Sequence, residues 1–355
     1  MIFRQLFDPT SSTYTYLLGC ERTGEAVLID AVYEMHERDD ALIRELDLNL
    51  RYVLDTHVHA DHVTGAWLMK DRWRAEIVLS KRSHAQNVDV EVEQGDVLGF
   101  GDAALEVRAT PGHTGGCITY VSTDRSRAFT GDCLMIRGTG RTDFQAGSAN
   151  ELWDSIRGQI FSLPDDCLIY PGHDYLGRTV SSVGEERRHN PRIGGDAQRE
   201  DFVGYMNNLG LPHPKLIDIA VPANQASGKP KDPDALHKVT WGPVTKTFAG
   251  VPEIRPDWVA RHLDELYVLD VRSEAEFAGE LGRLRGAHLI PLDQLRSRVT
   301  EIPKDARVVA VCQSGKRSAM ATEILRKAGY EKVANVAGGL IHWSRLALPH
   351  LQRAG

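Results

Sequence analysis

The chain has 355 residues, 42% of them hydrophobic, and this length exceeds the size at which a single core usually stops growing, so two domains are expected. Its formal net charge is −7 and it contains no dense run of Lys and Arg, which argues against nucleic acid as a partner. The chain opens without a basic and then apolar leader and has no bilayer-length apolar run, so we expect a cytoplasmic protein without a membrane partner.

The five cysteines are scattered along the chain and form no close pairs. They are Cys20, Cys117, Cys133, Cys167 and Cys312. An odd and dispersed set suits a reducing compartment better than a disulfide framework. Each cysteine is therefore expected to be either a buried thiol or a reactive one.

Short β-rich runs that end in polar turns dominate the first two thirds of the chain. These runs lie at 26–30, 51–55, 104–110, 117–122, 127–132 and 167–173. Between some of them, residues 62–75 and 149–163 place apolar side chains at helical spacing. The triplet Pro-Gly-His follows a predicted strand twice, at 111–113 and 171–173, which hints at a duplicated sheet unit.

From about residue 222 to 256 the chain is rich in Pro, Gly, Lys and Ser and shows little periodicity, which indicates a domain boundary near Gly250. Beyond it, strand and helix patterns alternate and predict a small parallel α/β domain. The strands are predicted at 267–271, 306–312 and 332–339, with helices at 273–280, at 318–330 and after the last strand. We therefore expect domains at 1–245 and 251–355.

The strongest signal in the sequence is Thr-His-Val-His-Ala-Asp-His at 56–62, a loop at the end of a predicted strand. A single His is more often a core or surface residue than a ligand, but four ligand-type side chains within six positions indicate a metal site. His113, Asp132 and His173 each follow a later predicted strand, where open α/β sheets gather their sites. Taken singly, none of these three would decide the matter.

The HxHxDH pattern and the later His, Asp and His resemble the metallo-β-lactamase superfamily over roughly residues 1–245. The resemblance implies an αββα sandwich with its site along the edge where the two sheets meet. Because that superfamily includes zinc hydrolases and redox enzymes, the motif indicates the scaffold better than the reaction.

Two stretches of the chain look like the persulfide dioxygenase branch rather than the glyoxalase II hydrolases. They are IRGTGRTDFQAG at 136–147 and YPGHDYLGRTVSSVGEERRHNPR at 170–192. In that branch two His and one Asp hold one Fe(II) per chain, and they correspond here to His57, His113 and Asp132. Such a set leaves three adjacent positions on the metal for O₂ and the substrate sulfur.

The remaining ligand-type residues would complete a two-metal site in hydrolytic relatives. They are His59, Asp61, His62 and His173. If the chain is a dioxygenase, they instead orient the ligands and tune the iron. Cys133 directly follows a ligand, yet we expect a small buried thiol there rather than a catalytic one.

The resemblance also implies that Tyr175 and Arg192 contact the glutathione part of the substrate, and a guanidinium can bind a carboxylate through two parallel hydrogen bonds. The alternative for Arg192 is an ion pair with Glu185 or Glu186. Arg141 orients either the loop of Asp132 or the substrate, and the sequence does not choose between these roles.

In the second domain, Cys312 begins the loop Cys-Gln-Ser-Gly-Lys-Arg-Ser, between an apolar strand and a helical pattern. The N–H groups of such a loop converge on one anion, and Lys316 and Arg317 add positive charge, so the thiol should ionise readily. A cysteine taken at random is most often buried, but this loop favours a nucleophile. Asp270 and Arg272 are expected to brace the loop or the domain core.

This loop resembles the rhodanese active site, and the match extends over about residues 251–350. It includes LDVRSEAEFAGE at 269–280 and GRLRGAHLIPLDQL at 282–295. Related phosphatases have one more residue between Cys and Arg, which enlarges the loop for phosphate. Here Arg317 is the fifth residue after Cys312, which favours sulfur as the transferred group.

As a whole, the chain resembles persulfide dioxygenase/rhodanese fusion proteins. The resemblance implies oxidation of glutathione persulfide by O₂ to sulfite and glutathione, and transfer of a sulfane sulfur from a donor such as thiosulfate through Cys312 to glutathione. The main alternative is a zinc-dependent glyoxalase II-like thioester hydrolase with an unrelated rhodanese, and metal analysis separates the two. A non-catalytic sulfur-binding module at the C-terminus is a further alternative, which Cys312 argues against. The oligomeric state, including a homo-oligomer, stays open.

Overall fold

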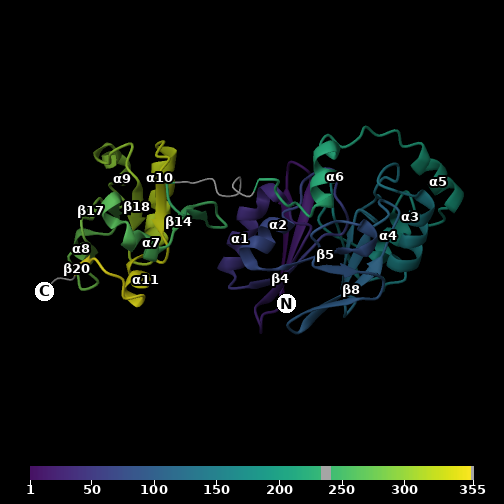
Figure 1. Cartoon of the computed structure of the whole chain (residues 1–355), viewed down its shortest axis with the longest axis horizontal. Coiled ribbons are helices and arrows are strands. Elements are labelled where there is room, and N and C mark those ends of the chain that lie inside the picture. Colours follow the sequence, from purple (N-terminus) through teal and green to yellow (C-terminus); the bar gives the residue numbers. More distant parts are fainter. Residues whose placement is uncertain (233–240, 353–355) are drawn as a thin grey trace. The chain divides into compact units, whose positions relative to one another are not determined.

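The computed structural model describes residues 1–232 and 241–352 of the chain. It divides into two compact units, Met1–Asp232 and Pro233–Gly355, which Figure 1 shows in purple to teal and in green to yellow. The predicted domain limits of 1–245 and 251–355 stay a prediction. Within the described residues, no helix combines the length and the hydropathy that a membrane crossing needs.

Two six-stranded mixed sheets form the centre of the first unit. One sheet has the order β1 (Ile2–Asp8), β2 (Thr13–Gly19), β3 (Glu25–Ile29), β4 (Asn49–Leu54), β5 (Glu76–Ser80) and β6 (Val90–Val92). The other has the order β12 (Ser181–Ser182), β11 (Leu168–Pro171), β10 (Arg127–Gly131), β9 (Ile118–Ser122), β8 (Ala103–Ala109) and β7 (Val97–Phe100). Strands β3 to β6 pair in parallel, as do β10 and β11, and the other neighbours are antiparallel.

Helices cover the outer faces of both sheets. They are α1 (His36–Glu45), α2 (Ala66–Trp73), α3 (Ala149–Ser155) with a π-helical continuation over Ile156–Ile160, α4 (Val183–His189), α5 (Arg199–Asn207) and α6 (Ile217–Gln225). Residues of α1 and α2 pack in one apolar layer with the first sheet, and α3 and α5 pack with the second. The predicted αββα sandwich is therefore confirmed.

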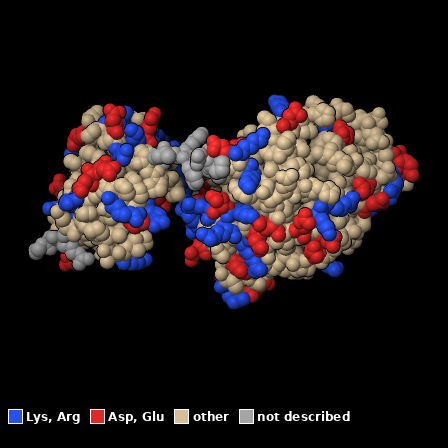
Figure 2. All heavy atoms as spheres, viewed as in Figure 1, with Lys and Arg blue, Asp and Glu red and all other residues tan. Residues whose placement is uncertain are grey.

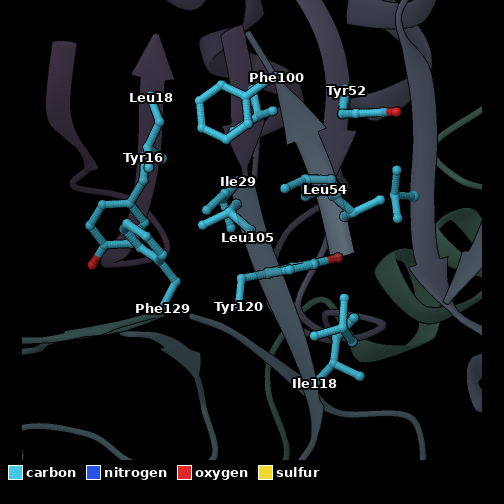
Figure 3. Close-up of a cluster of buried hydrophobic side chains, with 14 of the residues drawn as sticks. Tyr16, Leu18, Ile29, Tyr52, Leu54, Phe100, Leu105, Ile118, Tyr120 and Phe129 are labelled. Carbon is cyan, nitrogen blue, oxygen red and sulfur yellow. The ribbon is translucent and has the colours of Figure 1, made fainter. Parts of the chain in front are cut away.

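The alternation of side chains along a strand explains the layers. In β2, Tyr16 and Leu18 point into the core between the sheets, whereas Leu17 packs in the layer of α1 and α2. Figure 3 shows Tyr16 and Leu18 in this central core with Leu105 and Tyr120 of the opposite sheet. All seven residues of β2 are buried, so its two threonines, Thr13 and Thr15, also lie inside the unit.

The second unit is a smaller α/β layer structure. Its main sheet has the order β13 (Thr245–Lys246), β14 (Pro252–Ile254), β19 (Val333–Val336), β18 (Val308–Val311), β15 (Tyr267–Asp270) and β17 (His288–Leu289). The accompanying elements are α7 (Pro256–Arg261), α8 (Glu274–Phe277), α9 (Leu295–Arg298), α10 (Lys316–Lys327), α11 (Gly339–Arg345) and a separate two-stranded antiparallel sheet of β16 (Arg283–Leu284) and β20 (Leu351–Gln352). The sheet is parallel as predicted, except for the antiparallel edge strand β13.

Strand β18 shows why this sheet carries helices on both faces. Val309 and Val311 lie in one apolar cluster and Val308 and Ala310 in the other.

On the face shown in Figure 2, acidic and basic side chains lie interspersed over both units.

Candidate metal centre and cysteine loop

The structure brings the predicted ligand-type residues to one edge of the first unit. His57, His59, Asp61 and His62 follow β4, and the ring centroids of His57 and His59 lie 4.1 Å apart. The others follow strands of the opposite sheet: His113 comes after β8, Asp132 after β10 and His173 after β11. Parallel strands end at the same edge of a sheet, so residues far apart in the sequence meet there.

His57, His113 and Asp132 form one potential metal site. All three are buried, and each offers a ligand atom within 4.8 Å of the other two. The Oδ2 atom of Asp132 lies 3.7 Å from Nε2 of His113. Two imidazoles and one carboxylate in this arrangement fit a divalent metal such as Fe(II).

Each of these three side chains is held through one atom, and another of its ligand atoms lies near the other two residues. Nδ1 of His113 donates to the Arg141 carbonyl oxygen at 2.7 Å, and Oδ1 of Asp132 accepts from Nδ1 of His173 at 2.7 Å. The Thr56 hydroxyl donates to Asp30, so its oxygen accepts from Nδ1 of His57 at 3.0 Å. Such contacts select the tautomer whose Nε2 can bind metal and fix the direction of the ring.

The protonation states suit a metal site. Burial lowers the pKa of both His57 and His113, so the rings are neutral and offer a lone pair. Burial by itself would raise the pKa of Asp132, but the positive charge and hydrogen bond of His173 outweigh it and hold the pKa well below the usual range. The set is therefore ready to bind a cation.

The second group of predicted residues is largely occupied with internal contacts. Oδ2 of Asp61 accepts from Nδ1 of His62 and from Nε2 of His173, each at 2.9 Å. Both ring nitrogens of His173 thus face carboxylates. Burial by itself would lower the pKa of His173, but the negative charges of Asp132 and Asp61 raise that pKa well above the usual range. His59 binds Asp30 through Nε2 at 3.1 Å. Nδ1 of His59 and Nε2 of His62 are buried and have no hydrogen-bond partner in the part of the chain that the structure describes.

A cavity of about 240 Å³ opens beside these residues and contains all three predicted substrate-contact residues, Arg141, Tyr175 and Arg192. The Tyr175 side chain is exposed, and its ring lies nearly parallel to that of His173 with centroids 6.1 Å apart. Other lining residues include Asp61, His113, Asp132, Phe144, Arg178 and Leu211.

Arg192 has no carboxylate partner among the residues that the structure describes. Its Nη1 donates to the Thr139 carbonyl oxygen at 2.7 Å, and its guanidinium lies 5.4 Å from the ring centroid of Tyr205. The expected alternative, an ion pair with Glu185 or Glu186, is not formed. Both of those carboxylates accept from Arg137 instead.

Arg141 has the contacts of a positioning residue. Its Nε and Nη2 donate to the two carboxylate oxygens of Asp143, each at 2.6 Å. Nη1 and Nη2 also donate to the carbonyl oxygens of Pro212 and Leu211. Because the Arg141 carbonyl oxygen also accepts from His113, Arg141 connects this proposed ligand to the backbone of residues 211 and 212. Of the two roles left open by the sequence, these contacts favour orientation of the loop.

Several supporting residues carry no signal in the sequence. Asn224 of α6 is 3% exposed, accepts from the Thr64 N–H at 2.8 Å and donates to the carbonyl oxygens of His59 and His62 at 2.9 and 2.8 Å. It lies in the Pro- and Gly-rich stretch that we expected to be without periodicity. Gln145 similarly donates to the carbonyl oxygen next to His57, that of Val58, at 3.0 Å. Cys133 is fully buried, and burial raises its pKa, as expected of a structural thiol.

In the second unit, Cys312 follows β18 and lies in a loop whose donors point at its sulfur. The Gly315 N–H lies 3.2 Å and the Ser318 hydroxyl 3.4 Å from Sγ. Burial would raise the pKa of Cys312, but hydrogen bonds from the Ser318 side chain and from backbone N–H groups lower it. Gly339 approaches so closely that an added Cβ would lie 2.4 Å from the Cys312 carbonyl oxygen.

The two cations of the loop have different surroundings. Arg317 donates through Nη1 and Nη2 to both carboxylate oxygens of Glu276, at 2.7 and 2.6 Å, and Lys316 is exposed at the start of α10. The charge of Arg317 is thus balanced, and the hydrogen bonds take the larger part in lowering the thiol pKa. Arg272 and Asp270 form a buried pair that also binds the carbonyl oxygens of Glu276 and Gly282, so they brace this region as expected.

Comparison with known proteins separates the same two parts of the chain. Residues 8–173 match the metallo-beta-lactamase superfamily, and residues 255–346 match the rhodanese-like domain. The chain is 54% identical over 229 residues to "Persulfide dioxygenase ETHE1, mitochondrial" of Homo sapiens, which covers 64% of this chain and 89% of the human protein. The crystal structure of ETHE1 from Myxococcus xanthus is also 54% identical, with a TM-score of 0.63, and covers 64% of this chain and all of that one.

A hydrolase is among the relatives as well. Hydroxyacylglutathione hydrolase GloC of Haemophilus influenzae is 35% identical over 187 residues, which cover 47% of this chain and 86% of that protein. The higher identity of the persulfide dioxygenases confirms the predicted branch. The chain therefore belongs to the metallo-β-lactamase superfamily, as a homologue of the ETHE1 persulfide dioxygenases that carries a C-terminal rhodanese-like domain.

Proposed function

We propose that this chain oxidises glutathione persulfide with O₂ in residues 1–245 and transfers sulfane sulfur from thiosulfate to glutathione through Cys312 in residues 251–355. One Fe(II) would be held by His57, His113 and Asp132. The observation that carries the oxidation is the state of these three side chains, each anchored through one atom and offering another. The bound iron would supply O₂ activation and a site for the substrate sulfur.

The cavity residues support glutathione as the part of the substrate that is recognised. Arg192 lines the cavity with no carboxylate partner among the described residues, so its guanidinium can bind a carboxylate of glutathione. Arg178 is held by Asp174, and Arg141 by Asp143. The exposed Tyr175 can pack on the peptide portion.

A two-metal thioester hydrolase is the second candidate, and the relative from H. influenzae favours it. It would require Asp61, His62 and His173 to face a second ion. In this structure Asp61 and His173 bind each other, and His173 also binds Asp132. His59, Asp61, His62 and His173 also lie close enough together to hold a metal ion, but the internal pairing of Asp61 and His173 favours a single ion at His57, His113 and Asp132.

The C-terminal loop supports the sulfur transfer. The Cys312 thiolate attacks the outer sulfur of thiosulfate, an S–S bond forms at Sγ, and the thiosulfate S–S bond breaks with its electron pair on the departing sulfite. A glutathione thiolate then takes that sulfur and restores the Cys312 thiolate. The product, glutathione persulfide, is the substrate proposed for the first domain.

All five cysteines are free, which supports a reducing compartment such as the cytoplasm.

The deciding experiment measures metal content and O₂ uptake on the same purified protein. We expect one iron per chain and O₂ uptake with sulfite formation when glutathione persulfide is added. Two zinc ions per chain, with hydrolysis of a glutathione thioester and no O₂ uptake by iron-loaded protein, would instead establish the hydrolase.

A further inference from the structure

A buried series of polar side chains leads away from the sulfur of Cys312. Ser318 Oγ lies 3.4 Å from Sγ and 2.6 Å from Oδ1 of Asn335, and Nδ2 of Asn335 donates to Oε2 of Glu253 at 3.0 Å. Cys312, Ser318 and Asn335 are 1%, 0% and 3% exposed. Because water does not reach these groups, each must satisfy its hydrogen bonds within the protein.

The Ser318 hydroxyl has one proton and three acceptors within reach. These are Asn335 Oδ1 at 2.6 Å, the Gly315 carbonyl oxygen at 3.2 Å and Sγ of Cys312 at 3.4 Å. Since the carboxylate of Glu253 can only accept, it turns the Asn335 amide so that the oxygen faces Ser318. While Sγ is neutral, the Ser318 hydroxyl therefore donates to the amide oxygen of Asn335. A negatively charged Sγ is a stronger acceptor than that oxygen.

We propose that Asn335 is a positioning residue for sulfur transfer: its amide oxygen holds the Ser318 proton while Sγ is uncharged and yields it when Sγ is a thiolate. This inference rests on the proposed function, in which Sγ alternates between thiolate and the inner, uncharged sulfur of a persulfide. When glutathione thiolate attacks the outer sulfur, the S–S bond breaks with its electron pair on Sγ. The Ser318 hydroxyl then turns from Asn335 to the departing thiolate, so no buried hydroxyl is left unpaired in either state.

Charged and titratable groups are also present on the elements that surround the cysteine loop. They are Lys316 and Arg317 of α10, Glu276 of α8, Asp270 and Arg272 at the end of β15, Glu253 of β14 and His342 of α11. Arg317 is paired with Glu276, and Arg272 with Asp270. The variants of the test leave all of these groups in place.

The test is the pH dependence of Cys312 alkylation by iodoacetamide in the full-length protein. Mass spectrometry of the peptide that contains Cys312 is needed because the other four cysteines are also free. Asn335→Leu removes the competing acceptor, so we expect the midpoint to fall by about one pH unit, or about tenfold more thiolate below the midpoint. Ser318→Ala removes the donor, and its midpoint should rise by a similar amount.

Thr322→Val is the matched control, because Thr322 Oγ1 donates to the Ser318 carbonyl oxygen at 2.9 Å and has no contact with the sulfur. Its midpoint should equal that of the unmodified chain. An unchanged or raised midpoint in folded Asn335→Leu would overturn the proposal. If that variant does not fold, Asn335→Val applies the same criterion with a residue favoured in strands.

Alkylation needs no sulfur donor, so this result is independent of the proposed activity. Absence of thiosulfate-to-glutathione transfer in the unmodified chain would count against the proposed function. Opposite midpoint shifts in the two variants would still establish that Asn335 and Ser318 compete for one proton.

Discussion

The metal centre and the cysteine loop are assembled in opposite ways. The three proposed ligands come from loops after β4, β8 and β10, and contacts from other segments fix the atom that each presents. Cys312 instead lies in a continuous loop whose own N–H groups and Ser318 surround the sulfur. A dispersed site depends on the whole fold, whereas a local one depends chiefly on its loop.

The charges are also stabilised differently. At the metal centre the negative Asp132 is held beside the positive ring of His173. In the cysteine loop the thiolate is stabilised by hydrogen-bond donors, while Arg317 is paired with Glu276. Damage to one site should therefore leave the chemistry of the other intact, and the following variants test this.

The largest effect is expected from the metal ligands. His57→Ala or Asp132→Ala removes one of three ligands, so the protein should lose its iron and its O₂ uptake with glutathione persulfide. Metal analysis and an oxygen electrode measure both losses, and transfer from thiosulfate to glutathione should continue. Stoichiometric iron with near-normal O₂ uptake in both variants would contradict the ligand assignment.

Cys312→Ser should produce the converse loss. A serine hydroxyl cannot carry a persulfide, so thiosulfate and glutathione together should no longer drive O₂ uptake. Glutathione persulfide supplied directly should drive it at the normal rate, with full iron content. If a folded and iron-loaded variant fails with the direct substrate, Cys312 takes part in the oxidation and the two sites are not independent.

Arg192→Ala should have an intermediate effect, mainly on KM for glutathione persulfide. A carboxylate contact away from the reacting sulfur binds the ground state and the transition state alike. Loss of one charged hydrogen bond at about 1.5–3 kcal/mol corresponds to roughly 10- to 150-fold in KM. Arg188→Ala is the control, since Arg188 is an exposed residue that pairs with Asp165. An unchanged KM would assign Arg192 to the contact with Thr139 alone.

Asn224→Ala should show how far the metal centre depends on distant segments. It removes three hydrogen bonds to the backbone around His59 and His62, and loss of such supporting contacts typically weakens metal binding about 10- to 100-fold. Competition with a chelator, measured well below the unfolding temperature, gives the affinity. Asn208→Ala is the control, because Asn208 is exposed at the end of α5 and its side chain donates to the Gly204 carbonyl oxygen of that helix. Equal affinities in both variants would show that the loop needs no support from α6.

Much of the fold could be predicted because its elements have a clear period or a clear end. The strand predicted at 51–55 corresponds to β4, and the helix predicted at 318–330 corresponds to α10, with ends shifted by a few residues. The prediction did not assign β1 or β2. In β2 the alternation of Thr and Tyr spans only four residues, which is a short signal for a strand, and Leu17 and Leu18 then enter two different apolar layers.

The sequence by itself determined which chemical groups are present and which of them are neighbours along the chain. The dense motif at 57–62 indicated a metal, and the loop that begins at Cys312 indicated a nucleophile, because both signals lie within seven residues. Only the tertiary structure decided which partner each group has. It paired Glu186 with Arg137 rather than Arg192, and it placed Asn224 against the backbone of His59. These partners lie 49 and 165 positions apart. Hydrogen bonds over such separations leave no periodic trace in a sequence, so the partners become known only when the chain has packed.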